Sequence, residues 1–135
     1  MKFSTKSQYG LRAMVYLAKV FGDGEAHSLK EIAQQERISF DYLEKIISQL
    51  EKEKLVNSKR GVTGGYLLAK PPSKMKVGEI IRVLESSTSL VKCTGKKGQY
   101  VCPIEKYCLT KSFWEKIQKT LNTALDSMTL ADLIK

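Results

Sequence analysis

The hydrophobic periodicity of this chain changes at Lys54, and the change limits the folds that the chain can adopt. Before Lys54, apolar residues recur every three to four positions, as they do in amphipathic helices. After Lys54, the pattern favours two short strands joined by the glycine-rich sequence GVTGG. The predicted helices cover residues 5–21, 28–35 and 39–54, and the predicted strands cover 55–60 and 66–70. Three helices followed by a glycine-tipped hairpin form the order of a winged helix-turn-helix.

Polar residues mark where the second and third helices begin. Ser28 and Glu31 form the pattern of a capping box, in which the serine hydroxyl accepts from the Glu31 N–H and the carboxylate reaches back. Ser39 is predicted to cap the third helix, whose expected buried stripe is Leu43, Ile46, Ile47 and Leu50. His27, the only histidine, is predicted to be an exposed loop residue and not a metal ligand.

The rest of the chain is predicted to be helical around one long loop. A helix over residues 77–84 precedes the loop, and a long helix over 110–128 follows it. Thr129 and Asp132 form a second capping-box pattern, which opens a short terminal helix. The fold class is therefore mainly α, with a small β wing. The expected organisation is a winged helix-turn-helix domain over 1–85, a cysteine-containing loop over 86–109, and a dimerisation helix with a short terminal helix over 110–135.

The long helix over residues 110–128 carries an apolar stripe at close to heptad spacing. A domain this small cannot cover so long a stripe alone, which predicts that the helix pairs with a second copy of the chain. Packing on the first helix of the same protomer is the alternative, and different faces of the helix can serve both contacts. The residues expected at the dimer interface are Trp114, Ile117, Leu121 and Leu125.

Charge and position together predict which residues meet DNA. The chain carries 23 basic and 14 acidic residues, a net charge of +9, which favours a polyanionic partner over a merely lysine-rich surface. The candidates on the third helix are Ser39, Asp41, Tyr42, Glu44 and Lys45, and those in the wing are Lys59, Arg60, Gly61, Thr63, Gly64 and Gly65. Arg60 suits a narrow minor groove, whereas Tyr42 fits a packing role equally well.

Several functional classes lack their residues in this chain. It has one histidine, no Ser/His/acid set and no C-x-x-C motif, so the sequence does not indicate an enzyme. It also has no apolar run long enough to span a membrane, and its N-terminal stretch fits a helix better than a signal peptide. A cytoplasmic location is expected, where thiols stay reduced.

Three cysteines follow the spacing C-x8-C-x5-C in the loop before the long helix. They are Cys93, Cys102 and Cys108, and an odd number in one loop does not form a disulfide framework. Thiolates are soft ligands that suit iron–sulfur clusters and zinc, and nearby cations favour the thiolate form. Those cations are Lys92, Lys96, Lys97, Lys106 and Lys111. The spacing alone leaves four interpretations open: a cluster, redox-reactive thiols, a zinc site, or no ligand.

The sequence ISFDYLEKIISQLEKEKLVNSKRGVTGGYLLAK strongly resembles the recognition helix and wing of the IscR/NsrR/CymR-type regulators, the Rrf family. The opening MKFSTKSQYGLRAMVYLA, the segment VGEIIRVLE and the tail CLTKSFWEKIQKTLNTALDSMTLADLIK also match, so the resemblance covers essentially the whole chain. It implies a bacterial, cytoplasmic homodimer that binds an imperfect palindrome in double-stranded DNA. The implied function is a transcriptional repressor that senses redox state, nitric oxide or iron–sulfur status.

The resemblance also bears on the cofactor. Cluster-binding members carry three cysteines in this segment, which map onto the three cysteines here, although the first gap is longer in this chain. Lys111 occupies the position of the histidine ligand of IscR, and Gln8 that of the acidic ligand of NsrR-type members. The implied cofactor is a two-iron or four-iron cluster, completed by Gln8, Glu105, water or a small thiol, which protein prepared in air can lack. The CymR-type members imply the alternative, a cluster-free regulator controlled by thiol oxidation or by a protein partner.

Overall fold

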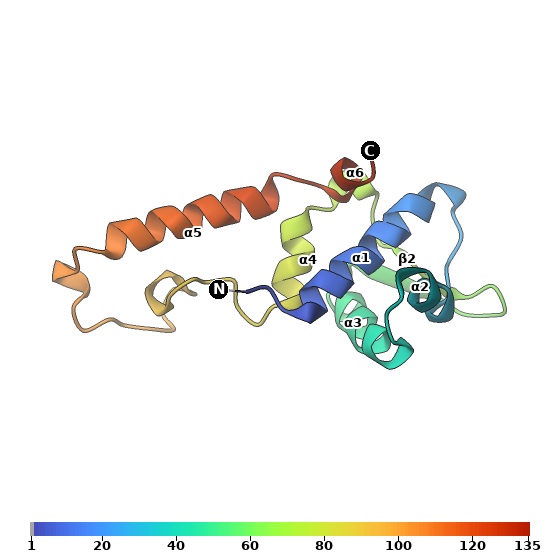
Figure 1. Ribbon diagram of the computed structural model, residues 1–135, viewed down its shortest axis with the longest axis horizontal. Coiled ribbons are helices and arrows are strands. Elements are labelled where there is room, and N and C mark those ends of the chain that lie inside the picture. Colours follow the sequence, from blue (N-terminus) through green and yellow to red (C-terminus); the bar gives the residue numbers. More distant parts are fainter. Residues whose placement is uncertain (1) are drawn as a thin grey trace.

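A computed structural model describes residues 2–135, which form helices and one small hairpin that projects at one end of the molecule (Figure 1). The helices are α1 (Thr5–Val20), α2 (Leu29–Glu36), α3 (Phe40–Lys52), α4 (Val77–Leu84), α5 (Lys111–Asp126) and α6 (Leu130–Leu133), and the strands are β1 (Val56–Lys59) and β2 (Gly65–Leu68). Short 3-10 turns cover Phe21–Asp23, Pro72–Lys74, Lys92–Thr94 and Glu105–Tyr107. Within residues 2–135, no helix is both long enough and apolar enough to cross a membrane. The predicted fold class, a mainly α winged helix-turn-helix, is confirmed.

The core of the winged domain forms around α3. All four residues of its predicted stripe are buried, and Ser39 caps the helix by accepting from the Tyr42 N–H at 3.3 Å. The stripe belongs to one apolar cluster with buried side chains of α1, α2 and α4, among them Met14, Ile32 and Ile80. Burying one such side chain stabilises a fold by about 1.5–3 kcal/mol, so the stripe fixes α3 against the other helices. The polar face of α3 is left pointing to solvent.

The wing is an antiparallel hairpin that is held on both sides. Strands β1 and β2 pair from Val56↔Leu68 to Lys59↔Gly65. On the other edge of β2, the His27 N–H donates to the Tyr66 carbonyl at 2.9 Å, and the Tyr66 N–H donates to the His27 carbonyl at 2.7 Å. Gly65 permits this approach, because its φ is +150° and an added Cβ would lie 2.2 Å from the His27 carbonyl oxygen. The loop before α2 therefore extends the sheet by one bridge.

The same loop differs from the sequence-based prediction. Ser28 caps α2 as predicted, since its hydroxyl accepts from the Glu31 N–H at 3.1 Å. The Glu31 carboxylate, however, turns to the Tyr16 hydroxyl and the His27 ring. A carboxylate binds a donor that carries a charge more strongly than it binds a neutral backbone N–H. The prediction that His27 is an exposed loop residue was wrong, because only 14% of its side chain is exposed.

The long helix α5 runs away from α1, beside the cysteine loop (Figure 1). At its C-terminal end, Asp126 accepts from two guanidinium nitrogens of Arg82 at 2.7 and 3.0 Å, which joins α5 to α4. The four predicted interface residues lie along the helix and stay partly exposed, while the polar residue Gln118 is buried. In a single copy of the chain, the apolar stripe of α5 is therefore incompletely covered.

Replacing Gly65 with alanine is expected to weaken the attachment of the wing. Because of its positive φ and its closeness to the His27 carbonyl, G65A should lower the free energy of unfolding by about 1–3 kcal/mol. Gly22 offers a matched control, since nothing lies within 4 Å of its added Cβ, and G22A should change stability by less than about 0.5 kcal/mol. Urea unfolding followed by circular dichroism measures both. Equal effects of the two substitutions would contradict the contact.

Candidate nucleic-acid interface and cysteine loop

The exposed face of α3 carries most of the predicted recognition residues. Asp41, Glu44 and Lys45 are exposed, and Ser39 lies exposed at the start of the helix. Tyr42 is half-buried and packs edge-on against Tyr9, with the ring centroids 5.8 Å apart. Of the two roles open to Tyr42, packing is the one for which the structure provides a contact. The first turns of α3 thus present acidic, basic and hydroxyl groups to solvent, which are the groups that read base edges and phosphates.

The wing presents two unpaired cations. Lys59 and Arg60 are exposed, and neither forms an ion pair with another of residues 2–135. The tip closes tightly: the Gly64 N–H donates to the Gly61 carbonyl at 3.0 Å, and an added Cβ on Gly64 would lie 2.4 Å from the Lys59 carbonyl oxygen. Thr63 is exposed within this turn. The backbone geometry therefore leaves both cations available for phosphates or a minor groove.

Two exposed apolar side chains also lie on these elements, and sequence reasoning missed them. Phe40, in the first turn of α3, is 46% exposed, and Val62, at the wing tip, is fully exposed. Neither packs against the apolar core. An apolar residue at a helix start or a hairpin tip was the signal that could have marked them.

The wing base and α3 lie within electrostatic reach of each other. Burial raises the pKa of Tyr66 in β2, and the charges of Glu51 and Glu44 on α3 raise it further. Glu44, a candidate base reader, is thus one of the acidic groups whose charge acts on Tyr66 in the wing.

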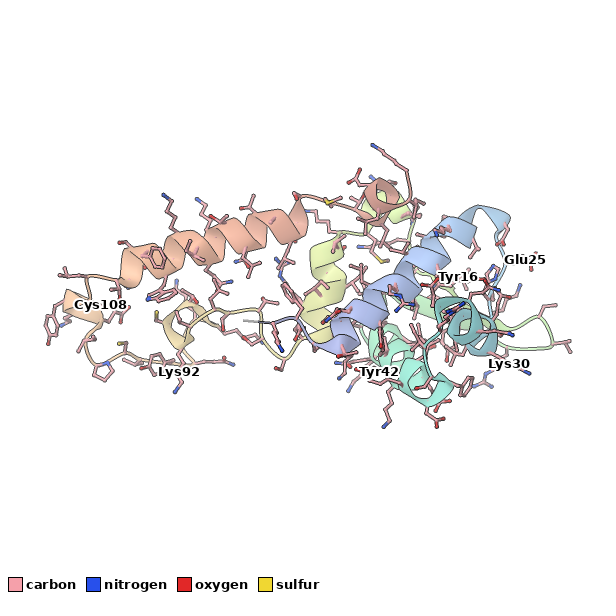
Figure 2. The ribbon with its side chains drawn as sticks, viewed as in Figure 1. Tyr16, Glu25, Lys30, Tyr42, Lys92 and Cys108 are labelled. Atoms are coloured by element: carbon pink, nitrogen blue, oxygen red, sulfur yellow. The ribbon has the colours of Figure 1, made fainter. Side chains whose placement is uncertain are left out.

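The cysteine loop spans from the turn at Lys92–Thr94 to the start of α5 (Figure 2). Cys93 is exposed, whereas Cys102 and Cys108 are half-buried. Across residues 2–135, no three His, Cys, Asp or Glu side chains lie close enough together to hold a metal ion. The structure thus places the three thiols in one loop but does not bring them together.

Cys108 lies beside hydrogen-bond donors at the start of α5. Its Sγ lies 3.3 Å from the Thr110 Oγ1. The pKa of Cys108 is lowered by the hydrogen bonds of the Thr110 hydroxyl and N–H, with a smaller effect of the Lys111 N–H and charge. These donors favour the thiolate, which is the form that ligates metals and reacts with oxidants.

The predicted fourth ligands are not aimed at the thiols. The Glu105 carboxylate accepts from Lys111 Nζ at 2.8 Å, and this contact lowers the pKa of Glu105. The Gln8 amide of α1 donates to the Phe3 carbonyl at 3.2 Å. The Glu105 carboxylate therefore already has a partner within one copy of the chain, and the Gln8 side chain is bonded through its amide nitrogen.

Gln118 fastens the start of the cysteine loop to α5, and sequence reasoning missed it. Its Oε1 accepts from the Leu90 N–H at 2.7 Å and from the Thr94 hydroxyl at 3.0 Å, and its Nε2 donates to the Thr88 carbonyl at 3.1 Å. A polar residue inside the apolar stripe of α5 was the only signal of this contact. The turn that contains Cys93 is consequently bonded to the middle of α5.

The segment that leads into the loop is bonded to the winged domain. The Glu85 carboxylate accepts from the Ser4 N–H at 2.6 Å and from the buried Ser7 hydroxyl at 2.8 Å. The Gln49 amide of α3 donates to the Val83 carbonyl of α4 at 2.9 Å. Hydrogen bonds therefore connect both α1 and the recognition helix to the end of α4, where the loop begins.

Known proteins share this architecture over the whole chain. Residues 3–135 match the family model Rrf2, described as an iron-dependent transcriptional regulator. The HTH-type transcriptional regulator IscR of Yersinia pseudotuberculosis is 36% identical over 134 residues, which cover 99% of this chain and 79% of that protein. The solved structure of T. potens IscR is 42% identical, with a TM-score of 0.76, and the match covers 99% of this chain and 86% of that one. CymR, the global cysteine regulator of B. subtilis, is 40% identical with a TM-score of 0.78, over 99% and 96% of the two chains.

These relatives carry the names of transcriptional regulators, not of enzymes. Their likeness covers the exposed recognition helix, the basic wing and α5 alike, so it is not confined to a common DNA-binding module. The family expected from the sequence is confirmed, and the chain belongs to the Rrf2 family of transcriptional regulators.

Proposed function

We propose that this chain is a homodimeric, DNA-binding repressor whose cysteine loop controls how two winged domains bind a palindromic site. The proposal rests on hydrogen bonds at the two ends of the segment from Glu85 to Thr94, which leads from α4 into the cysteine loop. Gln118 bonds the turn containing Cys93 to α5, and Glu85 bonds the end of α4 to α1. A change in the loop therefore acts on the helix that would pair two copies and on the domain that would read DNA.

In this proposal, α3 enters the major groove and the wing follows the backbone. Lys45 is placed to meet a phosphate or a base edge, and Glu44 can accept from a cytosine amino group. Lys59 and Arg60 are unpaired cations on the wing, which suits phosphate contact and insertion into a narrow minor groove. Two copies related by a twofold axis would present two such surfaces to one palindrome.

The stripe of α5 is the surface that we assign to the second copy. A groove of about 720 Å³ lies between the N-terminal residues, the segment 85–91 and α5. Its apolar lining includes Phe3, Leu90, Trp114, Ile117 and Leu121. An apolar groove beside an incompletely covered helix suits a partner helix of the same kind, because each copy then covers the other.

The cysteine loop has the donor set for an iron–sulfur cluster. Three thiols are the ligands that iron–sulfur clusters use, and five lysines against one glutamate within residues 92–111 would offset the negative charge of thiolate ligation. We assign Cys93, Cys102 and Cys108 as the protein ligands, with Gln8 or Glu105 as candidates for the fourth donor. When bound, such a cluster supplies redox and gas-reactive iron. The chain itself supplies three thiolates, a flexible loop, and the bonds that attach this loop to α5.

Control by the thiols alone is the second candidate, favoured by the lowered pKa of Cys108. A thiolate reacts with oxidants where a thiol does not, and Cys108 sits at the junction of the loop and α5. Control by a protein partner remains a further form of the same cluster-free alternative. Both would act on the loop through the same attachments.

The arginine of the wing provides a test of DNA recognition. Against a duplex selected by the protein from a random pool, R60A should lose about 1–3 kcal/mol of binding free energy if Arg60 reads the minor groove. K59A, a phosphate contact, should weaken the selected and a scrambled duplex equally, and should lower the salt slope by about one. Lys135, 81% exposed at the C-terminus, serves as the control. Fluorescence anisotropy measures these affinities, and an unchanged R60A at low salt removes Arg60 from the interface.

The cysteine assignment is tested by the colour of protein purified without oxygen. The wild type should show a broad visible thiolate-to-iron band with matching iron and sulfide, and C102A should lose it, because two thiolates from one loop hold a cluster poorly. K106A, a change in the same loop, should keep the band. Colour that persists in C102A contradicts the assignment. A colourless wild type that still binds DNA supports control by the thiols or by a partner.

The dimer is tested on the exposed side of α5. I117E should place a charge in the apolar groove and raise the dimer dissociation constant by about a hundredfold or more, because a buried unpaired charge is costly. K116E introduces the same residue at the neighbouring exposed position, outside the groove, and should leave the dimer intact. Sedimentation velocity at micromolar concentration distinguishes the two. A dimeric I117E would exclude this helix face from the interface.

A further inference from the structure

Four ionisable side chains meet beside strand β2 of the wing, next to Gly65 and away from the cysteines. They are Tyr16 of α1, Asp23 in the turn after α1, His27 in the next loop and Glu31 of α2. His27 Nδ1 lies 2.5 Å from Glu31 Oε2, and His27 Nε2 lies 3.0 Å from Asp23 Oδ2. The Tyr16 hydroxyl donates to the same Glu31 oxygen, and the Tyr16 ring meets the His27 ring edge-on at 6.0 Å. Figure 2 shows Tyr16 on the side of α1 near this loop.

The geometry favours the protonated form of the His27 ring. A neutral imidazole has one N–H and can donate to only one carboxylate, whereas here both ring nitrogens face carboxylate oxygens. Burial opposes a charge on His27, but the hydrogen bonds to Glu31 and then Asp23 outweigh it and raise the pKa of His27. The Tyr16 hydroxyl and His27 together lower the pKa of Glu31. The cluster is therefore a cation held between two carboxylates.

The other groups near His27 do not replace these contacts. Glu36 of α2 acts on Tyr16, not on His27, and is itself paired with Arg12 at 3.4 Å. From β2, Tyr66 meets His27 through its backbone. Among residues 2–135, the titratable side chains that contact the His27 ring are thus Asp23, Glu31 and Tyr16.

The backbone of His27 is the part that holds the wing. Its N–H and carbonyl form both hydrogen bonds to Tyr66, and its carbonyl fills the space beside Gly65. The side chain is tied to the turn after α1 on one side and to α2 on the other. The ring therefore fixes the position of the backbone segment against which β2 is paired.

We propose that protonated His27 is a positioning residue for the wing, so that site-specific DNA affinity falls when the ring loses its proton. The neutral ring can keep only one of its two donations. Asp23 and Glu31 are then left as neighbouring carboxylates without the cation between them, which repel each other. The loop before α2 loosens, and the wing loses the fixed edge that places Lys59 and Arg60 relative to α3. The inference rests on the proposed function only in assuming that the wing meets DNA.

The direction of the pH dependence follows from the folded and unfolded states of His27. The ring has its ordinary pKa of 6.5 when unfolded and a raised pKa when folded. The stabilisation from the contacts of protonated His27 with Asp23 and Glu31 is complete below pH 6.5. It is lost as the pH rises through the pKa that His27 has in the folded state. The wing is therefore held more firmly at a pH below the folded-state pKa of His27 than at a pH above it.

The test measures DNA affinity from pH 6 to 9 at constant salt, with a duplex that the wild type selects from a random pool. The wild type should lose about fivefold or more in affinity across one proton-linked transition, and H27Q should lack that transition. D23N, which removes one of the two carboxylate charges, should move the midpoint to lower pH. Circular dichroism confirms that each variant folds. Hydrogen exchange of the Tyr66 amide, which donates to the His27 carbonyl, measures how firmly this loop holds β2. It should be faster in H27Q than in the wild type at pH 6.

Each outcome decides the matter. Identical pH profiles of the wild type and H27Q overturn the proposal, and so does an equal pH effect on a scrambled duplex, which reports only the loss of a positive charge near DNA. If H27Q does not fold, the proposal is decided by D23N, in which the midpoint of the pH transition in DNA affinity should move to lower pH. If no duplex is selected at all, the proposed DNA function fails, and exchange at Tyr66 still shows whether the ring holds the wing.

Discussion

The buried stripe of α3 is the contact on which the winged-helix part of the chain depends. Leu43, Ile46, Ile47 and Leu50 fill the space among α1, α2 and α4. Because these residues take one side of the helix, the other side is free to present polar groups in a fixed orientation. The same packing brings Gln49 to the Val83 carbonyl, so α3 is also bonded to the end of α4. The surface that we propose to read DNA is thus oriented by buried residues on the opposite side of α3.

Outside the apolar core, hydrogen bonds of polar side chains join the elements to one another. Burial opposes the charge of Glu85, but the Ser4 N–H and the Ser7 hydroxyl outweigh it and lower the pKa of Glu85. Gln118 makes the corresponding joint on α5 with a neutral amide. Hydrogen bonds are directional, and a buried polar group without its partner costs about 1–3 kcal/mol. The hydrogen-bonded contacts of Glu85 and Gln118 therefore have few alternative geometries. A regulator that switches between two states needs contacts of this kind.

Local patterns predicted the parts of the molecule that form locally. Helix starts at Ser28 and Ser39, the stripe of α3 and the glycine-tipped hairpin all arise from neighbours in sequence. Contacts between distant segments left no such trace. The sequence around Glu31 fits a capping box, yet its carboxylate binds Tyr16 and His27 in the folded chain. The residues near Gln118 in sequence give no indication that its side chain binds Leu90 and Thr94. The spacing of the cysteines left four interpretations open, and only the resemblance to the family implied three thiol ligands. Neither predicted the assembly of the thiols, because ligand binding and closure of such a loop are coupled.

The cysteine loop is attached to one helix at both of its ends. Thr94 bonds to Gln118 in the middle of α5, and Cys108 contacts Thr110 just before the first residue of α5, while Cys102 lies between these two points in sequence. Under the proposed function, any ligand or bond that draws Cys102 toward the other thiols shortens the loop between two fixed points. Such shortening pulls on both attachment points, and both of them lie on or next to α5. Because Arg82 holds the far end of α5 to α4, that pull reaches the winged domain.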